Sequence, residues 1–235
     1  EQDYHFKVLF LILKELGYQW ADSCYHMSYG MVELPSGKMK SREGSVVDAD
    51  DFMQEMVDNA RNIASELGKI GELSNKQQEE VYEIVGLGAL KYFLLKVDPK
   101  KNMLFDPVAS IDFNGNTAPF IQYTYARIQS LKSKHKGDKV IVDSLDILSQ
   151  EKELIKMILD FPNIINESAR TYNPSLVANY IYNSVKEYNS YYQTVKILSG
   201  DNDSIISFRV ALSDMLGKVI KDGMDLLGID VPNRM

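Results

Sequence analysis

The sequence predicts a mainly α protein whose second half is an all-helical bundle. Through most of the chain, apolar side chains recur at three- and four-residue spacing, the period of an amphipathic helix. Hydrophobic residues make up 45% and charged residues 25% of the 235 residues, which is typical of a globular protein. Alternating, strand-like sequence is confined to one short segment near the start. No internal repeat or low-complexity tract suggests another architecture.

The first 48 residues combine one helix with one strand. The helix is predicted from an apolar stripe that ends before Gly17, a residue that favours helix C-termini; the stripe comprises Phe6, Leu9, Phe10, Leu13 and Leu16. Residues 26–34 alternate loosely and are rich in Met, Tyr and Val, which predicts a strand, and residues 35–37 form a turn. Because the helix has no cap or lead-in, we expect the chain to be cut from a longer protein.

Residues 48–96 are predicted to form two helices. Asp48 and Asp50 are suitable N-caps for the first helix, whose apolar stripe is Phe52, Met56, Ile63 and Leu67. The second helix is expected over residues 76–96, and its GLGA sequence at 86–89 is small enough for close helix packing. Residues 97–118, which prolines interrupt, are predicted to be a linker or an ordered loop.

Further helices are expected over residues 119–134, 144–160, 174–195 and 204–227. Asn173 is predicted to cap the third of these helices and Pro174 to occupy its first position. Its buried stripe is predicted to be Val177, Ile181, Val185, Tyr188 and Tyr192. The last helix is predicted to end at Gly228 and to bury Phe208, Leu212, Met215, Leu216, Val219 and Ile220.

The charge is negative overall and uneven along the chain. A formal net charge of -7 argues against a generic polyanion binder. Between residues 91 and 139, however, the sequence has nine basic and four acidic residues, a local net charge of +5. This window is either a phosphate-facing strip or a solvated basic loop.

Cysteine and hydropathy patterns indicate the compartment. Cys24 is the single cysteine, so an internal disulfide is excluded and a cysteine zinc site is not expected. No apolar run approaches the roughly 20 residues that a membrane span requires, and no signal peptide is visible. These patterns predict a cytoplasmic protein without membrane association.

Hydrolase, metalloprotease and phosphate-loop motifs are missing from the sequence, including H-E-x-x-H, G-x-S-x-G, G-x-G-x-x-G and G-x-x-x-x-G-K-[ST]. The segment that stands out is GKMKSREG at residues 37–44, where Lys38, Lys40 and Arg42 lie on a glycine-bounded loop after a strand. Such a loop can bring cations onto a triphosphate and neutralise a departing pyrophosphate. An exposed charged hairpin tip is the alternative.

Four segments, in order, resemble arginyl-tRNA synthetases of class I. GKMKSREG resembles the K-M-S-K-S signature loop, and HMSYGMVEL at residues 26–34 resembles the strand before it. EQDYHF at residues 1–6 is similar to the family's turn at the amino-acid pocket. FNGNTAPFIQY at residues 113–123, continuing to Ala126 and Arg127, resembles the start of the anticodon-binding domain with the D-A-L-R motif. The ending LLGIDVPNRM resembles the family's C-terminus.

The resemblance implies a fold and a set of domains. An all-helical anticodon-binding bundle would follow the C-terminal remnant of an α/β, Rossmann-like catalytic domain. Residues 1–48 would belong to the catalytic domain, residues 49–112 to a helical connector, and residues 113–235 to the anticodon-binding domain. The H-I-G-H signature that completes the family's ATP site is absent from these 235 residues, so we expect the chain to be inactive alone.

The resemblance also implies an arginine–tRNA ligase that joins arginine to its tRNA through arginyl-adenylate, with ATP, its Mg²⁺ counter-ion, L-arginine and tRNA-Arg as partners. It implies no protein-bound metal, no prosthetic group and no DNA, and a monomer at full length. A non-catalytic tRNA-binding module and a helical scaffold protein are the alternatives.

The implied site residues fall into three groups. The ATP-binding group is Lys38, Met39, Lys40, Ser41, Arg42, Met31 and Val32, the last two through backbone groups at adenine. The signature's serine aligns with Lys40 and its second lysine with Ser41, a departure from the family pattern. Gln2 would lie in the arginine pocket with His5 close to it. The tRNA-binding group is Phe120, Arg127, Tyr192 and Met235, while Lys196 replaces an aromatic residue of some relatives.

Overall fold

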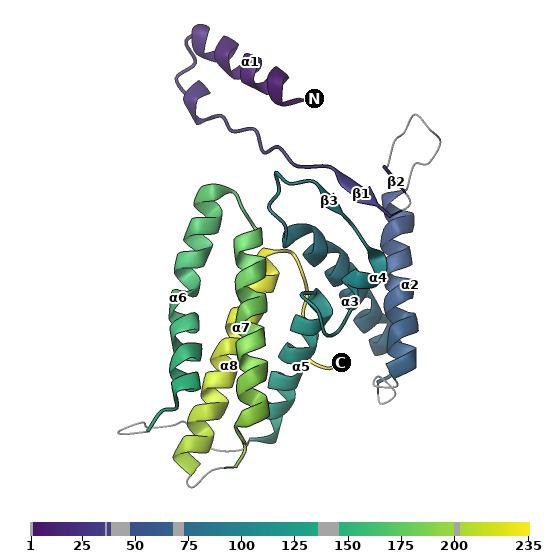
Figure 1. Ribbon diagram of the computed structural model, residues 1–235, viewed down its shortest axis with the longest axis vertical. Helices are drawn as coiled ribbons and strands as arrows, with labels where there is room; N and C mark the ends of the chain where they lie inside the picture. Colours follow the sequence, from purple (N-terminus) through teal and green to yellow (C-terminus); the bar gives the residue numbers. More distant parts are fainter. Residues whose placement is uncertain (1, 36, 39–47, 68–72, 136–145, 200–202) are drawn as a thin grey trace.

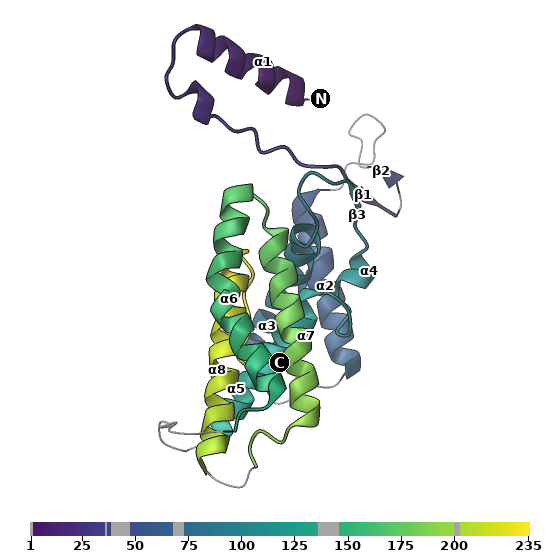
Figure 2. The same ribbon diagram turned by 60° about the vertical axis from the view of Figure 1, so that its left-hand side comes forward.

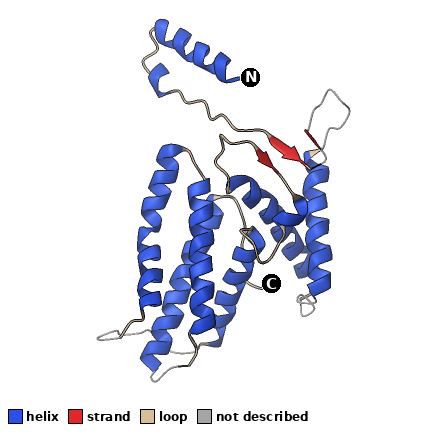
Figure 3. Cartoon of the chain, in the orientation of Figure 1, coloured by secondary structure: helices blue, strands red, loops and turns tan. Residues whose placement is uncertain are grey.

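The computed structural model describes residues 2–35, 37–38, 48–67, 73–135, 146–199 and 203–235. Helices dominate the described residues, and the strands are short (Figure 3). The helices are α1 (Gln2–Glu15), the 3-10 turn η1 (Ala21–Ser23), α2 (Ala49–Leu67), α3 (Asn75–Leu95), α4 (Pro107–Ser110), α5 (Ala118–Lys134), α6 (Ser149–Thr171), α7 (Ser175–Thr194) and α8 (Asp203–Leu226). The strands are β1 (Val32–Leu34), β2 (Gly37–Lys38) and β3 (Met103–Leu104). The predicted mainly α class is confirmed.

Helices α5 to α8 form the bundle (Figures 1 and 2). Every helix of the bundle contributes fully buried apolar side chains to one core, among them Ile121, Ile128, Leu154, Ile181, Val185, Leu216 and Ile220. Burying one such side chain contributes about 1.5–3 kcal/mol, so the core supplies most of the driving force that orders these helices.

The α2–α3 pair packs beside the bundle and joins it through α3, which contacts both α5 and α7. A side chain at Gly86 would place its Cβ 2.7 Å from the Met56 carbonyl oxygen, so the backbones of α3 and α2 are in direct contact. The close packing predicted for residues 86–89 is therefore confirmed.

A small sheet with the order β2–β1–β3 lies at the end of the α2–α3 pair (Figure 1). Strand β1 is antiparallel to β2, with Glu33 opposite Lys38, and parallel to β3. The prediction of a strand over residues 26–34 was too long, because only residues 32–34 have ladder partners among the described residues. The predicted linker at 97–118 is ordered and contains β3 and α4.

Of the helices predicted with bounds, α6 alone differs from the structure by more than one residue. Helix α6 covers 149–171, not 144–160, and it continues through Pro162 to a left-handed residue at Tyr172. Helix α7 begins at Ser175, one residue later than predicted. Pro174, which was predicted to be the first helical residue, is therefore at the N-cap, where the prediction placed Asn173. The Asn173 side-chain oxygen still accepts from the Ser175 N–H at 3.1 Å.

The predicted apolar stripes are wrong at two positions. Tyr192 is 36% exposed because it lies at the last turn of α7, beyond the core, and Tyr191 is buried with Tyr188 instead. Met215 is 44% exposed on α8, although Leu216 beside it is fully buried. A single helix can be assigned a stripe from its sequence, but the neighbours that cover each end decide the burial.

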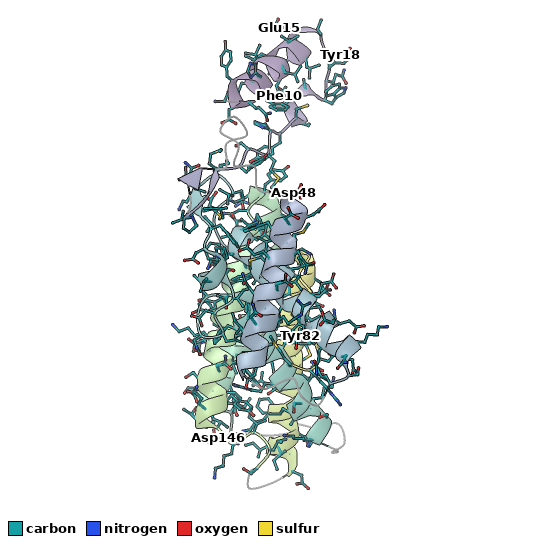
Figure 4. The ribbon with its side chains drawn as sticks, turned by 90° about the vertical axis from the view of Figure 1, so that its right-hand side faces the viewer. Phe10, Glu15, Tyr18, Asp48, Tyr82 and Asp146 are labelled. Atoms are coloured by element: carbon teal, nitrogen blue, oxygen red, sulfur yellow. The ribbon has the colours of Figure 1, made fainter. Side chains whose placement is uncertain are left out.

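Helix α1 forms as predicted and has no buried residue. It contacts η1 and lies beyond the end of the bundle (Figure 1). Figure 4 shows Phe10 and Tyr18 at this end of the molecule, Asp48 at the start of α2 below them, and Asp146 at the far end. The positive φ of Gly17 (83°) confirms the predicted helix stop.

The contact between α2 and α3 gives a first prediction. Gly86→Ala should lower the free energy of unfolding by about 1–3 kcal/mol, because the new Cβ must push the two backbones apart. Urea denaturation followed by circular dichroism measures the change. Gly115→Ala is the matched control, since its Cβ would meet nothing closer than 3.5 Å. Equal losses in the two variants would contradict this packing argument.

Candidate nucleic-acid interface

A groove of about 850 Å³ runs along α5 where it meets the end of α7 and the C-terminal tail. Helix α5 contributes Tyr123 and Arg127, α7 contributes Tyr192, and the tail contributes Asn233, Arg234 and Met235. Three of the four residues implied for tRNA binding therefore line one groove: Arg127, Tyr192 and Met235.

Arg127 is held at the centre of an aromatic stack. Its guanidinium carbon lies 4.9 Å from the ring centroids of both Tyr123 and Tyr192. One guanidinium nitrogen donates to Asn189 Oδ1 at 3.0 Å, and Asn189 Nδ2 donates to Thr124 Oγ1 at 2.9 Å. Two cation–π contacts and a fixed acceptor thus orient the cation before any ligand binds.

The three tyrosines near the end of α7 have different environments. Tyr188 is fully buried, and burial raises the pKa of its hydroxyl to about 12. Tyr191 is also buried, and burial together with the Glu151 carboxylate raises the pKa of its hydroxyl. Tyr192 alone of these three exposes its ring to the groove. Tyr188 and Tyr191 are thus core residues, which leaves Tyr192 available for stacking.

Glu151, in the first turn of α6, is a buried charged residue of the bundle. Its side chain is 0% exposed, and its Oε1 accepts from Arg209 Nε at 2.9 Å and from the Tyr191 hydroxyl at 3.0 Å. Its Oε2 accepts from the Leu148 N–H at the start of α6 at 2.8 Å. One carboxylate thereby joins α6, α7 and α8 below the groove.

The C-terminal tail returns across α5 because two side chains bind its backbone. Gln122 Nε2 donates to the carbonyl oxygens of Asp230 (2.8 Å) and Ile84 (3.1 Å), and Lys91 Nζ donates to Gly228 O at 2.7 Å. A Cβ at Gly88 would lie 2.6 Å from Gln122 Nε2, so a side chain at this position would displace the amide that makes these bonds. These bonds direct the tail so that Met235 packs against the α2–α3 pair at the groove.

Phe120, the fourth implied tRNA-binding residue, is not among the groove-lining residues. It lies in the first turn of α5 and is partly buried against the bundle core. Its ring centroid is 5.7 Å from that of Tyr182 on α7. The structure therefore gives Phe120 a packing contact and separates it from Arg127, Tyr192 and Met235.

Among its described residues, the basic window between residues 91 and 139 does not form one continuous strip; Lys136 and Lys139 lie outside the described residues. Lys96 Nζ donates to Asn116 O at 2.8 Å and lies 4.2 Å from the Phe93 ring centroid, and burial lowers its pKa. Lys132 pairs with Asp214 at 2.7 Å. Arg127 and Lys134 reach the groove. The interpretation as a phosphate-facing strip is therefore reduced to the residues at the groove, because several of the other cations serve the fold.

The signature segment begins at the small sheet. The backbone of Lys38 is described within β2, whereas Met39, Lys40, Ser41 and Arg42 lie outside the described residues. Before β1, the Met31 N–H donates to Asn102 Oδ1 at 2.8 Å and the Met31 carbonyl accepts from the Met103 N–H at 2.9 Å. Val32 follows as the first residue of β1.

Gln2 and His5 lie one turn apart on α1, and both are exposed. His26, which follows η1, packs on this helix. Its Nδ1 lies 3.1 Å from Asp3 Oδ1, and its ring stacks on the Phe6 ring with centroids 4.1 Å apart. Helix α1 and the small sheet lie toward one end of the molecule (Figure 1). The groove is lined by residues between Tyr123 and Lys134 of α5, and neither Gln2 nor His5 is among its lining residues.

Two residues that contact Arg127 were not predicted from the sequence. Tyr123 lies four residues before Arg127 on α5, a spacing that could have indicated the contact. Asn189 comes from another helix, and no linear pattern relates it to Arg127.

Within the described ranges, no group of three or more metal-binding side chains comes together. In the same ranges, no helix combines the length and apolar character of a membrane span.

Comparisons with known proteins agree with this geometry. A family model for the DALR anticodon binding domain matches residues 121–235, and one for the class I tRNA synthetase (R) catalytic domain matches residues 1–107. The arginine–tRNA ligases of Flavobacterium psychrophilum and Parabacteroides distasonis are 57% and 53% identical to the chain, each across all of it. The chain spans only 39% and 40% of their lengths.

Solved structures show the same arrangement. The arginyl-tRNA synthetase of Thermus thermophilus matches 98% of the chain with a TM-score of 0.86 and 26% identity, over 39% of its own length. A putative arginyl-tRNA synthetase from Campylobacter jejuni matches all of the chain with a TM-score of 0.69 and 16% identity, over 46% of its length. The second likeness shows the fold alone.

The contact between Gln122 and the tail gives a second prediction. Gln122→Leu should lower the free energy of unfolding by about 1–3 kcal/mol, because the carbonyl oxygens of Ile84 and Asp230 lose the donor that the buried Gln122 amide supplies. It should also speed the release of Met235 by carboxypeptidase, since the tail loses its attachment. Gln193→Leu on the exposed face of α7 is the control. Unchanged stability and unchanged release in Gln122→Leu would refute the attachment.

Proposed function

As the chain belongs to the class I arginyl-tRNA synthetase family, we propose that it forms the tRNA-reading part and the signature-loop part of an arginine–tRNA ligase. The observation that supports this proposal most directly is the groove, which brings Arg127, Tyr192 and Met235 together. The chain covers about two fifths of the length of its curated relatives, so the complete reaction is proposed for the protein that contains it.

The proposed reaction has two steps. The arginine carboxylate attacks the α-phosphorus of ATP, forming arginyl-adenylate and releasing pyrophosphate. A hydroxyl of the terminal adenosine of tRNA-Arg then attacks the arginyl carbonyl carbon and releases AMP. Lys38, Lys40 and Arg42 would neutralise the departing pyrophosphate, with Met39 and Ser41 forming the loop between them. Mg²⁺ would enter with ATP as its counter-ion.

The other residues implied for the catalytic site would position ATP and arginine. Strand β1 pairs with β2, so the backbone of Val32, the first residue of β1, and of Met31 just before it lies near the start of the loop. We propose that this edge contacts adenine, chiefly through Val32, because the Met31 N–H and carbonyl already have partners. Gln2 would contact arginine from one face of α1, with His5 one turn away.

The groove would bind unpaired bases of the anticodon loop. Stacking one base on an exposed ring contributes roughly 1–3 kcal/mol, and the ring of Tyr192 is exposed at the groove. Arg127 lies between two rings with one side fixed by Asn189, so its remaining donors are oriented for a base edge or a phosphate. Because the chain carries a net charge of -7, we expect binding to be local to this groove.

Arginylation and ATP–pyrophosphate exchange test the catalytic half. We expect both activities, in the presence of arginine and tRNA-Arg, from the complete protein that contains this chain. We expect neither from the 235-residue chain, because half of a site gives little rate acceleration. A chain that turned over at the rate of the complete protein would refute this division. A complete protein that bound tRNA without either activity would favour the non-catalytic tRNA-binding module.

The groove itself is tested by Arg127→Ala. This change should weaken the binding of tRNA-Arg about tenfold or more, as expected for the loss of one oriented contact, and leave the thermal unfolding midpoint within about 2 °C. Filter binding and circular dichroism measure the two quantities. Arg170→Ala is the matched control, because Arg170 is an exposed arginine on α6 that pairs with Glu167.

A tRNA-Arg with an altered anticodon separates recognition from charge. The wild-type chain should prefer the unaltered anticodon, and Arg127→Ala should reduce that preference. Equal binding of both tRNAs, fading together as salt is raised, would instead indicate a merely basic surface.

A further inference from the structure

Residues 2–29, here called the N-terminal arm, lie beyond the end of the bundle without a core of their own (Figures 1 and 2). The arm comprises α1, η1 and the extended chain up to Tyr29. Helix α1 has no buried residue and contacts η1. Among the described residues, no buried core contact joins α1 to the bundle.

An aromatic stack joins the arm to the bundle. The rings of Tyr25 and Tyr172 lie nearly parallel, with centroids 4.3 Å apart and an interplanar angle of 17°. Tyr172 directly follows α6, at the end of the bundle that faces the arm. The two residues are 45% and 51% exposed, so the stack lies at the surface.

The backbone of Tyr172 is unfavourable for a tyrosine. Its φ of 54° is left-handed, and it is the one non-glycine residue with positive φ in the described part of the chain. Gly17 after α1 and Gly228 after α8 have φ of 83° and 67°, and glycine adopts such angles without steric cost. A glycine would end α6 with less strain, which indicates that the ring of Tyr172 has a role outside the bundle.

We propose that Tyr172 is a positioning residue whose stack on Tyr25 holds the N-terminal arm in a fixed place at the end of the bundle. The consequence for the proposed function is that the stack sets where Gln2 and His5 lie relative to the groove. The test below does not use tRNA, so its failure is distinct from failure of the proposed function.

Trp20 is the single tryptophan of the chain and lies in the arm, next to η1. Time-resolved anisotropy of its fluorescence in the 235-residue chain therefore reports motion of the arm. Tyr172→Gly and Tyr25→Leu should each increase the amplitude of the fast nanosecond component about twofold or more. Tyr172→Phe keeps the ring and should retain the wild-type decay. Tyr29→Leu is the matched control, because Tyr29 is an arm tyrosine with 85% exposure.

Thermal unfolding provides the second readout. Tyr172→Gly should leave the unfolding midpoint unchanged or raise it, because glycine suits the left-handed angle. A midpoint lowered by several degrees would make Tyr172 a structural residue of the bundle and overturn the proposal. An unchanged anisotropy decay in both Tyr172→Gly and Tyr25→Leu would also overturn the proposal. So would an increase of the fast component in Tyr172→Phe equal to that in Tyr172→Gly.

Discussion

The buried amide of Gln122 fixes the path of the last residues, and the groove depends on that path. Its donors bind one carbonyl on α3 and one in the tail, so a single side chain joins three segments distant in sequence. Glycine at position 88 favours the arrangement, because a Cβ there would lie 2.6 Å from the amide nitrogen and displace it. The contact between α3, α5 and the tail thereby contributes to the choice of side chains that line the groove.

The segment before α5, residues 113–117, is also fixed by polar side-chain bonds to other helices. Asn116 Oδ1 accepts from the Tyr92 hydroxyl at 2.7 Å, and its carbonyl accepts from Lys96. Asn179 on α7 donates to the Lys96 carbonyl at 2.9 Å. The loop before α5 is thus bonded to α3, and α3 to α7, through buried or half-buried polar groups. Asn116, which lies in the segment that resembles the family pattern, therefore has a structural role in joining this loop to α3.

Sequence periodicity predicted the helices well, since most of them bury one continuous face. It failed where burial depends on neighbours: Tyr192 and Met215 lie on predicted stripes yet are exposed. The resemblance selected Arg127, Tyr192 and Met235, which one groove brings together, but also Phe120, which packs elsewhere. Asn189 could not be found, because its contact with Arg127 crosses between helices 62 residues apart.

The ion pair of Glu151 and Arg209 limits how this end of the bundle can evolve. A lone carboxylate left in a dry interior costs several kcal/mol, whereas two well-packed apolar residues can replace the pair with little loss. Neither partner can therefore be exchanged first without passing through an unstable intermediate. Natural variation at these two positions should consequently be correlated, with Tyr191 and the N-terminus of α6 adjusting to whichever pair is present.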